Sequence, residues 1–155
     1  MTSWTPAPAG GQGSLDDSPG QVRGGKLRVL DPEECLSLLE SASVGRVGFM
    51  SADGIVMLPV NYAVAAKTIV FRTAPDTLLA AQGNGLVSFE VDRIDEISRE
   101  GWSVLVQGHA RKVAGEDEVR RLEHCTSLEP WASGARDVWV RIIPVHISGR
   151  RIRRP

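Results

Sequence analysis

Apolar and polar residues alternate along most of the chain after about residue 25, in short runs separated by glycine-rich turns. A repeat of two is typical of β-strands with one buried face. It predicts strands over residues 44–50, 55–63, 67–73, 86–92, 101–113 and 138–147. Asp53 and Gly54 supply the positive φ angles of a tight hairpin turn, so the first two strands should pair antiparallel.

Helical signals interrupt the strands at three places. Asp31 can cap a first helix, with Pro32 at its first position and Glu34 completing a capping box, and we expect Gly45 to end it. Residues 76–82 predict a second helix, closed by glycines. Residues 116–126 predict a third, amphipathic helix.

This order of elements predicts a mainly β fold with flanking helices. We expect a six-stranded antiparallel barrel, because closure removes sheet edges that would otherwise aggregate. Residues 1–25 are rich in Gly, Pro, Ser and Ala, and we expect a disordered tail there, followed by one domain over 26–155. The arginines of residues 150–154 are expected to form a solvated end.

Composition narrows the function classes. The net charge of −1 shows no excess of basic residues over the whole chain, so we expect no nucleic-acid partner. Cys35 and Cys125 lack metal-site spacing, so we expect reduced thiols on helices and no metal. The chain shows no apolar run of spanning length and no secretory leader pattern, so we expect a cytoplasmic protein without membrane association.

One short stretch carries candidate chemistry. Arg72 and Thr73 end a predicted strand, and Asp76 and Thr77 start the predicted helix that follows. Backbone N–H groups at a helix start favour a phosphate, and a guanidinium can bind the same group through two hydrogen bonds. Asp76 as a simple N-cap and Arg72 as a solvated strand end are the alternative.

The chain from about Leu30 to Ile152 resembles the pyridoxamine 5′-phosphate oxidase-like family of flavin-binding split β-barrels, in particular its small actinobacterial-type members. The resembling segments cover nearly the whole folded region and are residues 30–35, 44–49, 58–63, 71–81, 89–92, 101–108, 130–131 and 139–142. The resemblance implies a split barrel, a bound flavin mononucleotide (FMN) and a homodimer with one flavin at each end of its interface.

The resemblance also implies residue roles. Val60, Asn61 and Tyr62 match the strand that lies along the flavin ring. Arg72, Thr73 and Thr77 match the phosphate end. Four further residues are expected to approach from the partner subunit, namely Trp102, Ser103, Trp131 and Arg141.

The chain departs from the family pattern at the phosphate end. Relatives commonly read Gly-Thr-Lys-Leu, whereas this chain reads Asp76-Thr77-Leu78-Leu79. The change removes a cation and adds a carboxylate, which disfavours a phosphate dianion by Coulomb's law unless Arg72 compensates. The flavin affinity is therefore expected to be lower than in those relatives.

The function predicted on this basis is an FMN-dependent oxidoreductase that acts on a small planar substrate. A reductase that uses the deazaflavin coenzyme F420 is an alternative, and so is a non-catalytic module that binds or senses flavin or haem. No side chain stands out as a catalytic acid or base, since a lone strand histidine such as His109 is more often structural.

Overall fold

A computed structural model describes residues 25–81 and 84–154. Within these residues the chain forms seven strands and three helices. In chain order they are β1 (Lys26–Leu30), α1 (Pro32–Glu40), β2 (Val44–Ser51), β3 (Gly54–Ala65), β4 (Thr68–Thr73), α2 (Leu78–Ala81), β5 (Asn84–Asp95), β6 (Glu100–Lys112), α3 (Glu116–Cys125) and β7 (Val138–Arg153). The expected tail, residues 1–25, lies outside the described residues except for Gly25.

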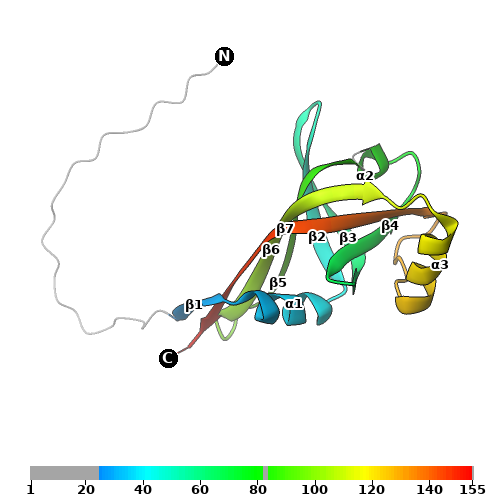
Figure 1. Cartoon of the computed structure of the whole chain (residues 1–155). Coiled ribbons are helices and arrows are strands. Elements are labelled where there is room, and N and C mark those ends of the chain that lie inside the picture. Colours follow the sequence, from blue (N-terminus) through cyan, green and yellow to red (C-terminus); the bar gives the residue numbers. More distant parts are fainter. Residues whose placement is uncertain (1–24, 82–83, 155) are drawn as a thin grey trace, which may run out of the picture.

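The sheet is an antiparallel split β-barrel, as the sequence predicted. Strand order is β1-β7-β4-β3-β2-β5-β6, and β6 also pairs with β7, so six of the strands form a ring. The ring is weakest between β2 and β5, where only three residue pairs face each other, from Arg46 to Gly48. The long strand β7 crosses the whole molecule, with α3 beside its start and β1 beside its end (Figure 1).

The end of β7 corrects one expectation. Arg150 and Arg153 are exposed, as expected for a solvated end, but they and Arg151 do not form a loose tail, because they belong to a strand that pairs with β1 on one side and β6 on the other. Strand β1 was missed in the sequence, since its Lys26 and Arg28 interrupt a short apolar pattern. The basic side chains are therefore presented on a rigid strand.

Helix α1 begins as predicted and ends earlier. Asp31 and Glu34 form the expected capping box, with the Glu34 N–H donating to Asp31 Oδ1 at 2.8 Å. The helix ends at Glu40 with Ser41 as C-cap, so the expectation that Gly45 ends it was wrong. Gly45 lies in β2, where a Cβ atom would fall 2.3 Å from the Phe89 ring. Close packing in the core, and not helix termination, requires glycine there.

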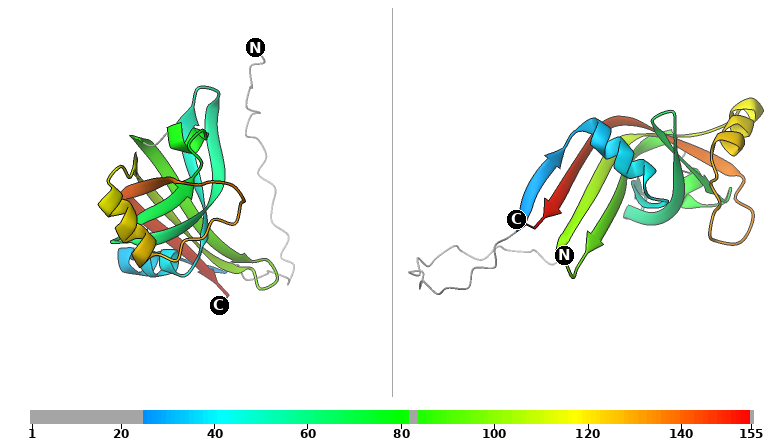
Figure 2. Two further views of the ribbon diagram at one scale, coloured as in Figure 1. Left: turned by 90° about the vertical axis from the view of Figure 1, so that its right-hand side faces the viewer. Right: turned by 90° about the horizontal axis from the view of Figure 1, so that it is seen from below.

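The barrel holds the main core, and α3 covers a second one. Phe71, Phe89 and Ile142 are fully buried inside the ring. Val70 points the other way and is equally buried, because it packs with Trp139 and with Leu122 of α3. Figure 2 shows α3 and the segment that follows it against the outside of the barrel, so the outer face of β3, β4 and β7 is covered. This covered face carries the candidate site.

Candidate functional site

A cavity of about 520 Å³ lies between the end of α1, strand β3 and the segment after α3, and we call it the α1–β3 cavity. This volume is within the usual range for small-molecule sites. Its lining residues are Leu39, Glu40, Ala42, Ser43, Asn61, Tyr62, Ala63, Val64, Cys125, Thr126, Ser127, Leu128, Glu129 and Trp131. The lining contains two carboxylates and several hydroxyl groups, and it contains no lysine, arginine or histidine.

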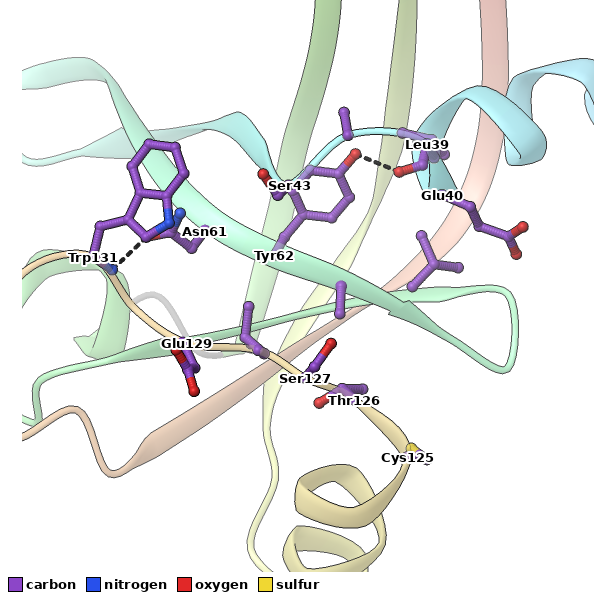
Figure 3. A pocket seen from close by; sticks show the side chains of 14 residues that line it. Leu39, Glu40, Ser43, Asn61, Tyr62, Cys125, Thr126, Ser127, Glu129 and Trp131 are labelled. Atoms are coloured by element: carbon purple, nitrogen blue, oxygen red, sulfur yellow. Dashed lines mark hydrogen bonds between the residues drawn. The ribbon is translucent and has the colours of Figure 1, made fainter.

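Asn61 and Trp131 are joined at one end of this cavity (Figure 3). The backbone N–H of Trp131 donates to Asn61 Oδ1 at 2.9 Å. That bond fixes which way the amide faces, so its NH₂ group is left as a donor. The Trp131 indole is 76% exposed and offers a flat aromatic surface beside the cavity. Two residues predicted for the flavin site are thus brought together within one chain.

Tyr62 and Val60 point into the barrel. The Tyr62 hydroxyl donates to the Leu39 carbonyl at 2.5 Å, and its ring meets Phe89 edge to face with centroids 4.9 Å apart. Burial raises the pKa of Tyr62. Val60 is also part of the buried core. Tyr62 therefore ties β3 to the last turn of α1, where a backbone carbonyl would otherwise lack a partner.

Arg72 lies on β4, outside the barrel. Its Nε donates to the Arg136 carbonyl at 2.8 Å, and its guanidinium carbon lies 5.4 Å from the centre of the Trp139 ring. Its Nη2 is 3.9 Å from Asp137 Oδ1, which is a long ion pair. The carbonyl and the aromatic ring together hold the guanidinium in one orientation, and its terminal nitrogens have hydrogen-bonding capacity left for an anion.

Thr73 and Thr77 form the rest of what we call the Arg72 cluster, and their hydroxyls bond each other at 2.8 Å. Thr77 Oγ1 donates to the Ala74 carbonyl and accepts from the Ala80 N–H, so Thr73 is the donor between them. Thr73 is only 2% exposed. Both hydroxyls are engaged within the chain, and they shape the turn that follows Arg72.

Helix α2 is shorter than predicted. The sequence suggested residues 76–82, whereas the helix covers Leu78–Ala81 and residue 82 lies outside the described residues. Thr77, and not Asp76, supplies the capping oxygen, because residues 74–77 form a turn first. A single helical turn has few aligned peptide dipoles, so the helix-start argument for phosphate binding is weak here.

The remaining predicted residues lie elsewhere in the chain. Trp102 and Ser103 are on β6 opposite Arg151 and Arg150 of β7, at the β1 end of the molecule. Arg141 is on β7 under α3, where it bonds Thr68 Oγ1 and Glu118 Oε1, each at 3.1 Å. The buried Arg141 Nε has no hydrogen-bond partner among the described residues.

Residues 126–137, which we call the connecting segment, join the two halves of the candidate site. Its backbone bonds Asn61 through Trp131 and Arg72 through Arg136. Five polar residues of the cavity were not predicted, namely Glu40, Ser43, Thr126, Ser127 and Glu129. They come from a helix end and from loops, where the sequence has no periodic pattern that would point to one site.

Comparison with known proteins decides the family. Residues 31–151 match the sequence profile of the pyridoxamine 5′-phosphate oxidase family. The chain belongs to this family. An uncharacterised protein of Mycobacterium tuberculosis is 34% identical over 146 residues, covering 90% of this chain and 93% of the relative.

Solved structures of similar proteins agree with this family and with the split-barrel fold. The FAD-binding protein from Mycobacterium smegmatis is 35% identical, with a TM-score of 0.68 over 81% of this chain and 98% of that one. A putative pyridoxamine 5′-phosphate oxidase from Corynebacterium glutamicum is 32% identical, with a TM-score of 0.71 over 83% and 95% of the two chains. The structural similarity therefore extends over nearly the full length of both relatives.

Among the described residues no helix is long and apolar enough to span a membrane. The same residues bring no three His, Cys, Asp or Glu side chains together as a metal site. Cys35 and Cys125 are free thiols on α1 and α3, as the sequence predicted.

Proposed function

We propose that this protein binds a flavin nucleotide and acts as an oxidoreductase on a small planar substrate. The observation that carries the proposal is Arg72, a partly exposed guanidinium held by the Arg136 carbonyl and the Trp139 ring. A cation held in this way can bind a phosphate without losing much side-chain freedom. The FAD-binding relative from Mycobacterium smegmatis supports a flavin as the ligand.

The donor set fits a flavin only in part. Asn61 has an amide NH₂ available for the polar edge of a flavin ring, and the backbone of Val60 and Tyr62, whose side chains point into the barrel, would flank it on the same strand. The hydroxyls of Thr73 and Thr77 bond within the chain, so we assign the main phosphate contact to Arg72. A bound flavin would supply the redox chemistry, and the protein would hold and orient it.

We further propose that the protein is a homodimer in which Trp102 and Ser103 complete the partner's flavin site. Trp131 and Arg141, predicted for the same role, are left out of this proposal because Trp131 bonds Asn61 of its own chain and Arg141 is held under α3 by Thr68 and Glu118. In support, the outer face formed by β2, β5, β6 and the first half of β3 has exposed apolar side chains, and among the described residues α3 covers only the second half of β3. Those side chains include Ile55, Met57, Leu86 and Leu105. Burying them against a second copy would remove apolar surface from water.

The location that we propose is the cytoplasm. Its support is that both cysteines are free thiols, as expected in a reducing compartment.

The cofactor can be identified by gel filtration of the protein after incubation with FMN, FAD or F420, followed by visible absorption of the protein peak. Co-elution of FMN or FAD at one flavin per chain is the expected result. Retention of F420 alone would show that the cofactor is the deazaflavin and not FMN or FAD. A peak without any of the three would contradict the proposal and favour a non-catalytic module that binds another ligand.

A further inference from the structure

The α1–β3 cavity and the Arg72 cluster differ in charge. Glu40 and Glu129 line the cavity, and no basic side chain does. Within residues 25–81 and 84–154, neither carboxylate forms an ion pair, whereas Glu34 and Glu118 are paired with arginines. Two unpaired carboxylates at one cavity repel an anionic guest and attract a cationic one.

The groups that could orient a guest are aromatic and uncharged. The exposed Trp131 indole lies at the end where its backbone N–H bonds Asn61, and Glu40 lies at the other end in the view of Figure 3. Ser43 and Ser127 add exposed hydroxyl groups to the lining. An indole face binds flat rings, and it binds them more strongly when they carry positive charge.

Two hydroxyl groups of the lining already form hydrogen bonds within the chain and would contribute only to the shape of the cavity. The Tyr62 hydroxyl bonds the Leu39 carbonyl, and Thr126 Oγ1 donates to the Leu122 carbonyl at 2.8 Å. The Asn61 amide is assigned to the flavin, so the groups left for a guest are the indole, the serine hydroxyls and the two carboxylates.

We infer that the α1–β3 cavity binds a planar aromatic amine or amidine in its cationic form and rejects phosphorylated or carboxylated analogues. As an assignment of the substrate class this rests on the proposed flavin site, because the redox partner would be the flavin. As a binding site it stands on the cavity alone, so the two can be tested separately.

The direct test uses two probes of equal shape and opposite charge, benzamidinium and benzoate, titrated by calorimetry into the full-length protein without flavin. Benzamidinium is expected to bind about tenfold more tightly than benzoate, and its affinity should fall as salt is added. Pyridoxamine is likewise expected to bind more tightly than pyridoxamine 5′-phosphate. Equal affinity for the two members of either pair, or tighter binding of the anions, would overturn the inference.

Variants of the two carboxylates test whether benzamidinium binds in the α1–β3 cavity. The double variant Glu40→Gln with Glu129→Gln should weaken benzamidinium binding about fivefold, since each exposed charge contributes only a modest interaction. Glu123→Gln on α3 is the matched control, because Glu123 is exposed and does not line the cavity. An unchanged affinity in the double variant would move the site elsewhere and refute the inference.

Flavin binding is measured independently of benzamidinium binding. FMN binding is measured by gel filtration in the wild type and in the double variant, and it should be equal in both, which also shows that the variant is folded. If benzamidinium fails to bind while FMN is retained, this inference fails and the proposed function stands. If FMN fails to bind while benzamidinium follows the carboxylates, the cavity assignment stands without its redox role.

Discussion

The α1–β3 cavity and the Arg72 cluster lie side by side and have opposite chemistry. Tyr62 of β3 pairs with Phe71 of β4, and Asn61 and Arg72 are the next residues along each strand. One side presents unpaired carboxylates and an indole, and the other presents a guanidinium held by a carbonyl and a second indole. Two neighbouring strands thus separate the proposed anion-binding end from the proposed cation-binding cavity.

The same segment covers both regions. The connecting segment accepts a hydrogen bond from Arg72 and donates one to Asn61. The family resemblance assigns these two side chains to the cofactor, whereas in this chain they also hold a loop in place. Binding of the proposed flavin would therefore be coupled to the position of that loop through these two side chains.

Among the substitutions that distinguish the two regions, removal of the Arg72 guanidinium should change ligand affinity the most. Arg72→Ala is expected to weaken FMN binding about 10- to 100-fold, because it removes hydrogen bonds between charged groups. Its effect on folding should be small, since Arg72 is partly exposed and is not in the main core. Equilibrium titration measures the affinity, with Arg120→Ala on α3 as a control. Unchanged affinity would remove Arg72 from the site.

The variant Tyr62→Phe tests whether the Tyr62 hydroxyl only stabilises the wall of the cavity or also binds a guest. We expect the free energy of unfolding to fall by about 1–2 kcal/mol, because the Leu39 carbonyl loses its buried partner. Benzamidinium affinity should stay within about twofold, since the hydroxyl is not available to a guest. Urea unfolding and calorimetry measure the two quantities. A large loss of affinity in a fully folded variant would make Tyr62 a binding residue.

Restoring the cation of the family pattern should strengthen the anion-binding end. Leu78 is 53% exposed directly after Thr77, so Leu78→Lys can place a charge there without disturbing the core. FMN affinity is expected to rise about two- to fivefold at low salt, and the gain should shrink as salt is added. If affinity does not change, the phosphate geometry of the family does not transfer to this chain.

The smallest effect is expected from the carboxylate that competes for Arg72. Asp137 is 3.9 Å from the guanidinium and is largely exposed, so Asp137→Asn should raise FMN affinity about twofold or less. The same substitution should leave benzamidinium binding unchanged, because Asp137 does not line the cavity. Parallel titrations of both ligands check this, and a changed benzamidinium affinity would argue that the two regions are not separate.

The strands could be predicted from the sequence because their faces differ in polarity. The alternating pattern did not predict positions that depend on tertiary packing. Val70 lies on the outer face of the barrel and is buried there by α3, and Gly45 lies in a strand against Phe89. Strand β1 has two basic residues among five and gains its place only by pairing with β7. Local periodicity contains no information about such distant partners.

The candidate site was predicted in part, on its strands and at Thr77 and Trp131. Asn61 was found through the family resemblance, and Arg72 was found because it precedes a predicted helix start. Glu40 and Glu129 were not found, because they are 89 positions apart and meet only when α1 and the connecting segment fold onto β3. The charge of the cavity is therefore a property of the tertiary structure.

The most direct test of the separation between the two regions is to compare FMN with riboflavin, which lacks only the phosphate, in the wild type and in Arg72→Ala. The account predicts that the wild type prefers FMN by about tenfold or more and that Arg72→Ala reduces this preference to near one. A preference for FMN that survives in Arg72→Ala, or a wild type that binds the two equally, would contradict it.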